Sequence, residues 1–299
     1  MENSEKILSF KFNNRSEKKP KRVVVLGTSG IISSNLQKVL KKKYVNILPI
    51  GRSKLDLKSK NTIKALARKI NKEDVVIFIA AEAPVKNIKM FINNLKICGT
   101  VCESLKKKKI KQLVYISSDA VYTDVMGKIS ENSSTLPNSL HGLMHLTREL
   151  ILKERFKKIL CILRPTLIYG VGDTHNGYGP NRFINLANKN KNIKLFGRGE
   201  ELRDHIYIED IVKIIIECII KKATGVLNLA SGKVYSFNYL AKAIVRLSKS
   251  KSKILKTKRV GKMPHNGYRP FNIKSLKENF PRVKIGSLKK NLEEYILYN

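Results

Sequence analysis

Short apolar runs alternate with helical patterns along the first half of the chain, and this alternation limits the fold more than any other feature. The runs are rich in β-branched residues and too short for helices, so we expect strands buried on both faces. They are Val23–Leu26, Tyr44–Ile50, Asp74–Ile79, Gln112–Ser117 and Ile159–Leu163. Apolar residues recur at helical spacing over Ile31–Lys43, Asn61–Ile70, Ile88–Lys108 and residues 142–157. Strands alternating with helices predict an α/β fold with a doubly wound parallel sheet.

The turn between the first strand and the first helix has the spacing GxxGxx(small). It reads Gly27-Thr28-Ser29-Gly30-Ile31-Ile32-Ser33. The first glycine permits a tight turn, and the second lets a pyrophosphate approach the backbone at the helix N-terminus. Ser33 stands where a third glycine normally allows close helix–strand packing. The turn therefore predicts a dinucleotide site that includes Gly27, Ser29, Gly30 and Ile31.

The end of the second expected strand bears on which dinucleotide binds. An acidic residue at this point would bind a ribose 2′-hydroxyl, whereas an arginine accommodates a 2′-phosphate. The chain has Arg52 here, which favours NADP over NAD, although an arginine is also an ordinary surface residue of a basic protein. We expect Asp56 and Leu57 to border the adenine, and Ala80 and Ala81 to let the cofactor pass close to the backbone.

The pattern loosens beyond Arg164, and this divides the chain. We expect residues 1–20 to form a flexible basic arm and residues 21–170 a Rossmann-type domain, to which residues 206–235 return. A glycine-rich loop over Gly170–Pro180 and later short elements leave residues 171–205 and 236–299 for a small substrate lobe. Ligands of open α/β sheets bind at the carboxyl ends of the strands.

The net charge of +37 comes from 60 basic and 23 acidic residues. A polyanion partner is one interpretation. The other is a general Lys bias, because the excess is mostly lysine and scattered along the chain. Readers of nucleic acid use arginine forks and stacking aromatics, and the chain has no Trp. We therefore do not expect nucleic acid as a partner.

The cysteines and the hydropathy pattern indicate the compartment. The four cysteines form no CxxC pair, so we expect buried thiols in a reducing compartment, with no metal site and no disulfide. No stretch approaches the roughly 20 apolar residues of a membrane span, and the N-terminus lacks the apolar core of a signal peptide. The sequence thus predicts a cytoplasmic protein.

Several motifs occur in one order along the chain. They are GTSGIIS at 27–33, DVVIFIAAEAP at 74–84, YISSDAVY at 115–122, LRPTLIYG at 163–170 and RDHIYIED at 203–210. Over about residues 21–280 the sequence resembles the extended short-chain dehydrogenase/reductase family, which comprises NAD(P)-dependent nucleotide-sugar epimerases, dehydratases and reductases. The resemblance implies a nucleotide-sugar substrate, and a homodimer formed through the helices near 88–108 and 142–157.

The resemblance also implies a catalytic group. The family's Ser/Thr matches Ser118, whose hydroxyl would bind the reacting sugar oxygen. The family's Tyr and Lys, four residues apart on one helix face, match His141 and His145. None of the eleven tyrosines is followed four residues later by a lysine. The family pattern also implies cofactor contacts from Asn94 and Pro165.

Three interpretations of the histidine pair remain open. His141 can serve as the acid/base, because imidazole titrates near neutrality, with His145 contacting the ribose. The pair can bind a metal, since histidines at i and i+4 are a common ligand geometry, although no acidic or cysteine partner is evident. In the third interpretation the site binds its ligands without catalysing a reaction, and the chain is a non-catalytic dinucleotide- or nucleotide-sugar-binding protein.

Substrate-binding residues follow from the same resemblance. The family's nucleotide-sugar entry segment matches Asn181 and Arg182, after the glycine-rich loop. Arg203 matches the arginine that contacts the diphosphate, and its fork suits phosphate oxygens. Arg269 is a candidate second contact. We expect hydride-transfer chemistry, as an epimerase, dehydratase or reductase, on a nucleotide-activated sugar.

Overall fold

The computed structural model describes residues 8–43, 45–174 and 176–298, which divide into two compact units. Unit 1 consists of the residues up to Thr123, with Glu131–Pro165 and Val212–Leu229. Unit 2 consists of Asp124–Ser130, Thr166–Ile211 and the residues from Ala230 on.

Unit 1 is built on a parallel sheet. In the described part of the chain, seven strands pair in the order β1-β10-β6-β5-β4-β2-β3. All neighbours are parallel except β1, which is antiparallel to β10. The strands are β1 (Lys11–Phe12), β2 (Val23–Leu26), β3 (Ile47–Ile50), β4 (Val75–Phe78), β5 (Gln112–Ile116), β6 (Leu160–Pro165) and β10 (Ala223–Leu229).

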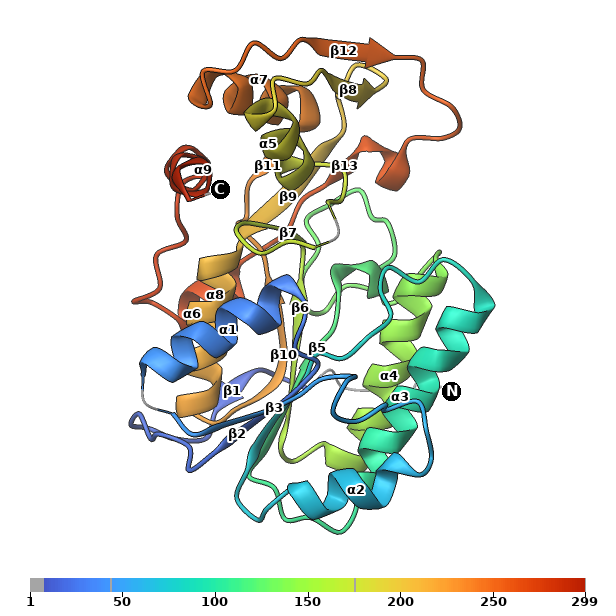
Figure 1. Cartoon of the computed structure of the whole chain (residues 1–299), viewed down its shortest axis with the longest axis vertical. Helices are drawn as coiled ribbons and strands as arrows, with labels where there is room; N and C mark the ends of the chain where they lie inside the picture. Colours follow the sequence, from blue (N-terminus) through green and yellow to red (C-terminus); the bar gives the residue numbers. More distant parts are fainter. Residues whose placement is uncertain (1–7, 44, 175, 299) are drawn as a thin grey trace. The chain divides into compact units, whose positions relative to one another are not determined.

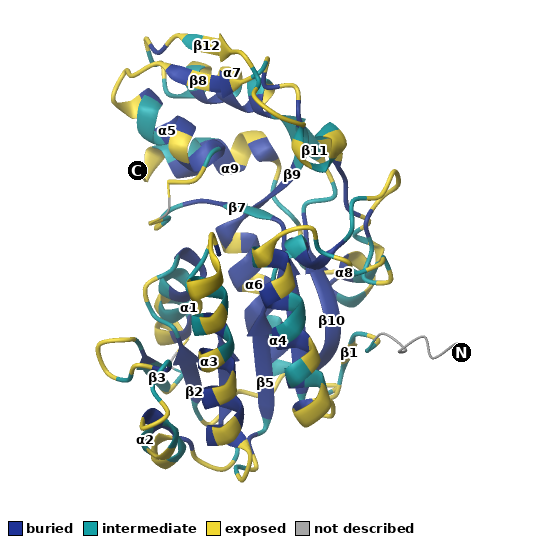
Figure 2. Ribbon diagram, turned by 90° about the vertical axis from the view of Figure 1, so that its right-hand side faces the viewer, coloured by how far each residue is buried: buried dark blue, intermediate teal, exposed yellow. Residues whose placement is uncertain are grey.

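Helices cover both faces of this sheet, as the doubly wound pattern requires. On one face lie α1 (Ile31–Lys42) and most of α6 (Ile208–Ile220); on the other lie α2 (Thr62–Lys69), α3 (Ile88–Leu105) and α4 (Leu140–Phe156) (Figure 1). A short 3-10 turn, η1 (Asp119–Val121), follows β5. Strands β2, β4 and β5 are buried along their whole length, whereas α3 and α4 expose one face (Figure 2). The buried strands correspond to the continuous apolar runs of the sequence, and the half-exposed helices correspond to its amphipathic patterns.

Unit 2 has two small sheets and short helices. In one sheet β9 (Leu202–Tyr207) pairs with β7 (Leu167–Tyr169), β11 (Val234–Ser236) and β13 (Tyr268–Arg269); in the other, β8 (Ile193–Phe196) pairs with β12 (Ile254–Thr257). The helices are α5 (Pro180–Asn188), α7 (Phe237–Leu247), α8 (Lys274–Asn279) and α9 (Leu288–Leu297), with a 3-10 turn η2 (Pro264–Gly267). Phe183, Phe237 and Tyr178 pack their rings together beneath α5 and α7.

The predicted α/β fold with its doubly wound parallel sheet is confirmed. Each expected strand and helix is present within a few residues of its expected limits; Tyr44, expected to begin the second strand, lies outside the described residues. Residues 1–7 of the expected arm also lie outside them. Lys11 and Phe12 form the edge strand β1 against Thr224 and Ala223, so this part of the segment is held by the sheet.

The observed units differ from the expected domains at their limits. Residues 124–130 belong to unit 2, because Ile129 bridges to Phe271 and bonds the carbonyl of Pro270 through its amide. Residues 166–170, 206–211 and 230–235 also belong to unit 2, where β7 and β11 each pair with β9. Pairing between distant segments sets these limits, and composition does not reveal it.

Candidate active site

The turn after β2 requires glycine at its first position. Gly27 has a φ of +96°, and a Cβ placed on it would lie 2.7 Å from the backbone nitrogen and Cα of Ala80. Because that separation is below normal contact distance, an alanine at 27 would force the turn away from the segment after β4. At the tight turn predicted at Gly27, the backbone after β2 therefore also passes close to the backbone after β4.

Gly30 begins α1 without a side-chain cap. Within the described chain, no side chain bonds its first-turn amides, and a Cβ on Gly30 would meet no atom within 4 Å. By contrast, α3 and α4 begin at Asn87 and Ser139, whose side chains accept bonds from first-turn amides. The first amides of α1 are thus open to an anionic ligand, which the helix dipole also favours.

The environment of Ser33 shows why a serine is accepted at the third small-residue position of the turn motif. Its side chain is buried, and its hydroxyl donates a 2.6 Å hydrogen bond to the Gly27 carbonyl. Gln37 in turn donates to the Ser33 hydroxyl at 3.1 Å. The hydroxyl therefore ties α1 to the turn that it follows, and close packing survives the substitution.

A cavity of about 290 Å³ lies beside this turn. Most residues predicted to bind the cofactor line it, namely Gly27, Ser29, Arg52, Asp56, Leu57, Ala80 and Ala81. The sequence did not single out six further lining residues, Thr28, Ile50, Gly51, Leu55, Lys58 and Ile97. Four predicted residues lie elsewhere: Gly30 and Ile31 open α1, Asn94 is buried in α3, and Pro165 ends β6.

Arg52 lies at the wall of this cavity and is largely exposed. Its guanidinium is 3.3 Å from Glu82, and the Lys58 ammonium is 3.1 Å from the same carboxylate. A hydrogen bond from Asn93 and the nearby Lys58 charge lower the pKa of Glu82, against the effect of its partial burial. Glu82 thus holds two cations beside the cavity.

Asn94 organises the segment after β4. Its amide is fully buried; the oxygen accepts from the Glu82 amide at 3.0 Å, and the nitrogen donates to the Glu82 carbonyl at 2.9 Å. The Arg148 guanidinium donates to the carbonyl and side-chain oxygens of Asn94 and to the Ala80 carbonyl, at 2.7–3.1 Å. Sequence reasoning found Asn94 and missed Arg148, whose partners are distant in sequence.

Ser118 and His141 lie at one junction between η1 and α4. The Ser118 hydroxyl accepts from the Ala120 amide at 3.1 Å and so caps η1. Gly142, next to His141, packs so closely on Ala120 that a Cβ would collide with its carbonyl. The structure therefore packs η1, which Ser118 caps, against the first turn of α4, which carries His141.

His145 lies behind His141, at the next turn of α4. The two imidazole centroids are 4.8 Å apart and nearly perpendicular. Nδ1 of His145 is 2.8 Å from the Tyr115 hydroxyl, and Nδ1 of His141 accepts a long 3.5 Å bond from the Val85 amide. Tyr115, a buried residue of β5, was not singled out from the sequence.

Burial favours the neutral form of both imidazoles. Burial lowers the pKa of His141, and the Arg148 charge lowers it further, against the effect of Asp119. Burial, His141 and Arg148 together lower the pKa of His145 well below the ordinary histidine value. Burial also raises the pKa of Tyr115, which favours its protonated phenol. A phenol that donates to Nδ1 of His145 leaves the His145 proton on Nε2.

A buried ion pair supports the helix that carries the histidines. Glu149 and Arg164 are both buried and bond through two contacts, at 2.9 and 2.6 Å. Ser117 donates to Glu149 at 2.6 Å, and Arg164 donates to the Tyr122 hydroxyl at 2.8 Å. The network joins α4 to β5 and β6, so it fixes the rotation of α4.

In unit 2, the Asn181 side chain forms hydrogen bonds with the backbone at the start of the loop that precedes it. Its side-chain oxygen accepts from the Gly170 amide at 3.0 Å, and its nitrogen donates to the Ile168 carbonyl at 3.3 Å. The neighbouring Arg182 is exposed on α5. Of these two predicted substrate residues, only Arg182 presents its side chain to solvent.

Arg203 and Arg269 are register partners on β9 and β13. Arg203 bonds Glu201 at 2.9 Å, and buried Arg269 bonds Asp124 at 2.5 Å. His265 shares the same Asp124 oxygen at 2.5 Å. The structure thus joins the two predicted arginines, each with an acidic partner, and adds His265 and Asp124, which sequence reasoning missed.

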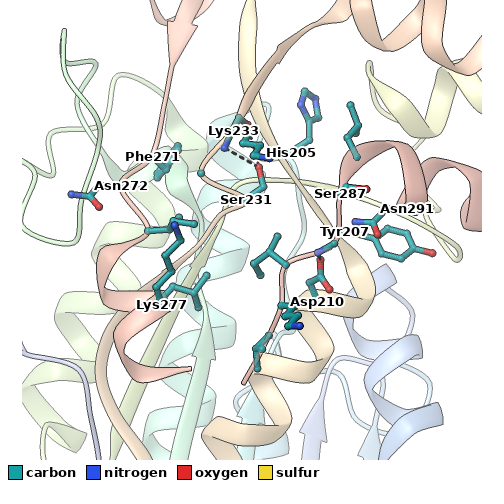
Figure 3. A pocket seen from close by; sticks show the side chains of 18 of the residues that line it. His205, Tyr207, Asp210, Ser231, Lys233, Phe271, Asn272, Lys277, Ser287 and Asn291 are labelled. Carbon is teal, nitrogen blue, oxygen red and sulfur yellow. Dashed lines mark hydrogen bonds between the residues drawn. The ribbon is translucent and has the colours of Figure 1, made fainter. Parts of the chain in front are cut away.

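A larger cavity, about 620 Å³, also lies within unit 2 (Figure 3). It is lined by Ser231, Lys233, Lys277, Tyr207 and Asp210, among others, and Asp210 accepts from the Gly286 amide at 3.0 Å. None of the four residues predicted to bind substrate lines it.

Two further features concern the described residues as a whole. Within them, no three His, Cys, Asp or Glu side chains are grouped so that they could hold a metal ion. Nor does any helix among them combine the length and apolarity that crossing a bilayer requires.

The curated proteins that resemble this chain in sequence have low identity to it. A dTDP-D-glucose 4,6-dehydratase of Dictyostelium discoideum is 28% identical over 282 residues, an alignment that covers 79% of this chain and 64% of that protein. A Bacillus subtilis protein described as an uncharacterized UDP-glucose epimerase is 28% identical over 223 residues, covering 64% of this chain and 70% of the relative. The chain therefore spans less than two thirds of the length of the Dictyostelium protein.

Solved structures share the fold. A UDP-glucose 4-epimerase of Thermotoga maritima, solved with UDP-glucose, superposes with a TM-score of 0.83 at 18% identity, over 93% of this chain and 98% of that chain. A UDP-glucuronic acid 4-epimerase of Bacillus cereus, solved with UDP-glucuronic acid and NAD, gives 0.80 at 21% identity with the same coverage. The model of the NAD dependent epimerase/dehydratase family matches residues 23–230. The chain belongs to the NAD dependent epimerase/dehydratase family.

Proposed function

We propose that this protein is a NAD(P)-dependent epimerase, dehydratase or reductase that acts on a nucleotide-activated sugar. The observation that carries the proposal is the cavity at the glycine turn, with the uncapped N-terminus of α1 beside it. A nicotinamide coenzyme bound there would take a hydride from the sugar or give one to it. Relatives solved with UDP-glucose, or with UDP-glucuronic acid and NAD, support the same substrate class.

Ser118 and His141 are the residues that we assign to the reacting sugar oxygen. A hydroxyl both donates and accepts, so Ser118 suits the alcohol and the carbonyl forms of the sugar. Neutral His141 accepts the proton of an alcohol being oxidised and returns it when a carbonyl is reduced. Because Tyr115 bonds Nδ1 of His145, Nε2 of His145 is the atom that we assign to the ribose or a bridging water.

We assign the substrate diphosphate to Arg203 and Arg269 of unit 2. Guanidinium forks bind phosphate oxygens through paired, charge-assisted hydrogen bonds. Diphosphate binding would compete with the carboxylates of Glu201 and Asp124 for these arginines. Arg182 is a further candidate contact, and Asn181 acts as a positioning residue for the loop.

Of the two coenzymes we propose NADP as the preferred one, on the strength of Arg52 and Lys58 beside the cavity. Arg52→Ala should weaken NADPH binding about tenfold, the worth of one exposed charge-assisted bond, and leave NADH binding unchanged. Equal loss for both coenzymes, or a wild-type protein that binds NADH more tightly, would reject the NADP preference while leaving the fold assignment intact.

The second candidate function is a non-catalytic binding protein of the same fold. The absence of the family's Tyr and Lys pair favours it. Incubation with coenzyme and a panel of UDP- and dTDP-hexoses, followed by chromatography of the sugars, separates the two candidates. Our proposal predicts a new sugar product that disappears in the Ser118→Ala/His141→Gln variant. Coenzyme and sugar binding without any product would establish the second candidate.

We also propose that the protein forms a homodimer through α3 and α4. Ile92 of α3 and Leu143 and Leu150 of α4 are each more than 40% exposed, although they are apolar. A paired helical face would bury them. Light scattering should give twice the 34.0 kDa chain mass, and Leu143→Glu/Leu150→Glu should give the single mass.

A further inference from the structure

Arg148 is a buried cation with no acidic partner. Its side chain is fully buried in α4, and no carboxylate in the described part of the chain pairs with it. Its guanidinium bonds neutral oxygens of Asn94 and Ala80, interacts with the Tyr115 hydroxyl, and lies 5.0 Å from the centre of the Phe78 ring. A buried charge is normally paired, as Arg164 is with Glu149 on the same helix. Among the described residues, Arg148 therefore carries its charge without an ion pair.

The charge of Arg148 lies on the helix that carries the two histidines. Arg148 follows His145 by three residues and His141 by seven on α4, which places all three on one helix face. The pair itself is influenced by Asp119 in η1 and contacts Tyr115 in β5, and Tyr115 is in turn influenced by Glu149 of α4 and Cys98 of α3. Burial opposes an imidazolium most strongly at both positions; at His141 the Asp119 charge favours one and the Arg148 charge opposes it more weakly, and Tyr115 is uncharged. Arg148 is thus the fixed cation of this cluster.

We propose that Arg148 is a positioning residue that adds to burial in keeping His141 and His145 neutral, so that His141 is ready to accept a proton. A protonated imidazole cannot take a proton from a sugar hydroxyl. Once His141 has accepted one, repulsion from the Arg148 charge favours its return to substrate. The same guanidinium holds the Ala80 carbonyl, and Ala80 lines the dinucleotide cavity. The catalytic part of this proposal rests on the proposed function; the electrostatic part does not.

Two substitutions separate the charge of Arg148 from its hydrogen bonds. Arg148→Lys keeps a positive charge on a long side chain, whereas Arg148→Gln keeps a hydrogen-bond donor, the side-chain amide, and removes the charge. Arg155→Gln is the matched control, because Arg155 lies on the same helix and forms a surface pair with Glu103. The readout is NMR titration of the imidazole Cε1 protons in ligand-free protein, with His141→Gln and His145→Gln for assignment.

Arg148→Gln should move the titration of His141 to higher pH, while Arg148→Lys and Arg155→Gln leave it near its wild-type position. With an identified substrate, Arg148→Gln should lose at least about tenfold in turnover near pH 6, with recovery as the pH rises. An unmoved His141 titration in Arg148→Gln overturns the proposal. So does a wild-type His141 that titrates at the ordinary histidine value, a measurement that needs no variant at position 148. If the titration moves and no nucleotide sugar turns over, the proposed function fails and the electrostatic role stands.

Discussion

The Tyr115 hydroxyl lies 2.8 Å from Nδ1 of His145, and both residues are buried. This contact holds one ring nitrogen of an imidazole at the position where the family pattern has a lysine. It also shows that His145 is part of a structured polar chain that continues to His141 by ring contact. The histidine pair is therefore held in a defined geometry.

Removing the Tyr115 hydroxyl tests that geometry. Tyr115→Phe leaves Nδ1 of His145 buried without a donor, which should lower the free energy of unfolding by about 1–3 kcal/mol. Urea unfolding measures the loss, and ¹⁵N chemical shifts of His145 should show a changed tautomer. A variant as stable as wild type, with unchanged shifts, would mean that the bond does not hold the imidazole.

Two glycine substitutions separate folding from cofactor binding. Gly27→Ala should destabilise the protein by several kcal/mol, because a Cβ would enter the Ala80 backbone at a positive φ. Gly30→Ala should fold normally, since its Cβ meets no protein atom within 4 Å. It should nevertheless weaken dinucleotide binding at least about tenfold, because the methyl group occupies the approach to the α1 amides. Thermal unfolding and coenzyme titration of both variants check the contrast. Normal coenzyme affinity in Gly30→Ala would move the pyrophosphate away from this turn.

The Glu149–Arg164 pair should be costly to break and tolerant of joint replacement. Glu149→Gln leaves the Arg164 cation unpaired in the core, which should cost about 3–5 kcal/mol. The double variant Glu149→Gln/Arg164→Met should recover part of that loss. Lys153→Gln, which removes only the distant 3.6 Å partner of Glu149, serves as control and should change stability little. Equal stability of Glu149→Gln and Lys153→Gln would contradict the role assigned to the buried pair.

Acid should destabilise the protein through buried neutral histidines. Burial lowers the pKa of His205 to about 3, whereas an unfolded histidine has a pKa near 6.5. Between these values the unfolded chain binds a proton that the folded chain does not. Stability therefore falls as the pH falls from about 6.5 toward 3, by up to about 1.4 kcal/mol per pH unit for this residue. His205→Phe, which can pack against Phe237, should flatten the unfolding midpoint plotted against pH over this range. Parallel curves for wild type and variant would show that His205 does not contribute.

Local patterns predicted most of the fold. Strand β2, the glycine turn and α1 follow one another in sequence, so residue spacing alone located them. The sequence did not indicate contacts that join distant segments. Asp124 with Arg269, Arg148 with Asn94, and Tyr115 with His145 meet only after the chain has folded. The sequence likewise predicted that His141 and His145 lie on one helix face. It did not predict the charged groups around them, because the contacts that bring those groups together join distant segments.

The central claim is that the glycine turn binds a nicotinamide dinucleotide. Isothermal titration calorimetry of the purified protein with NADPH, NADH and their oxidised forms tests it most directly, with Gly30→Ala as the matched folded control. The account predicts saturable binding of at least one coenzyme at one site per chain, weakened in Gly30→Ala. Absence of binding heat for all four coenzymes at several temperatures, in protein that unfolds cooperatively, would contradict it.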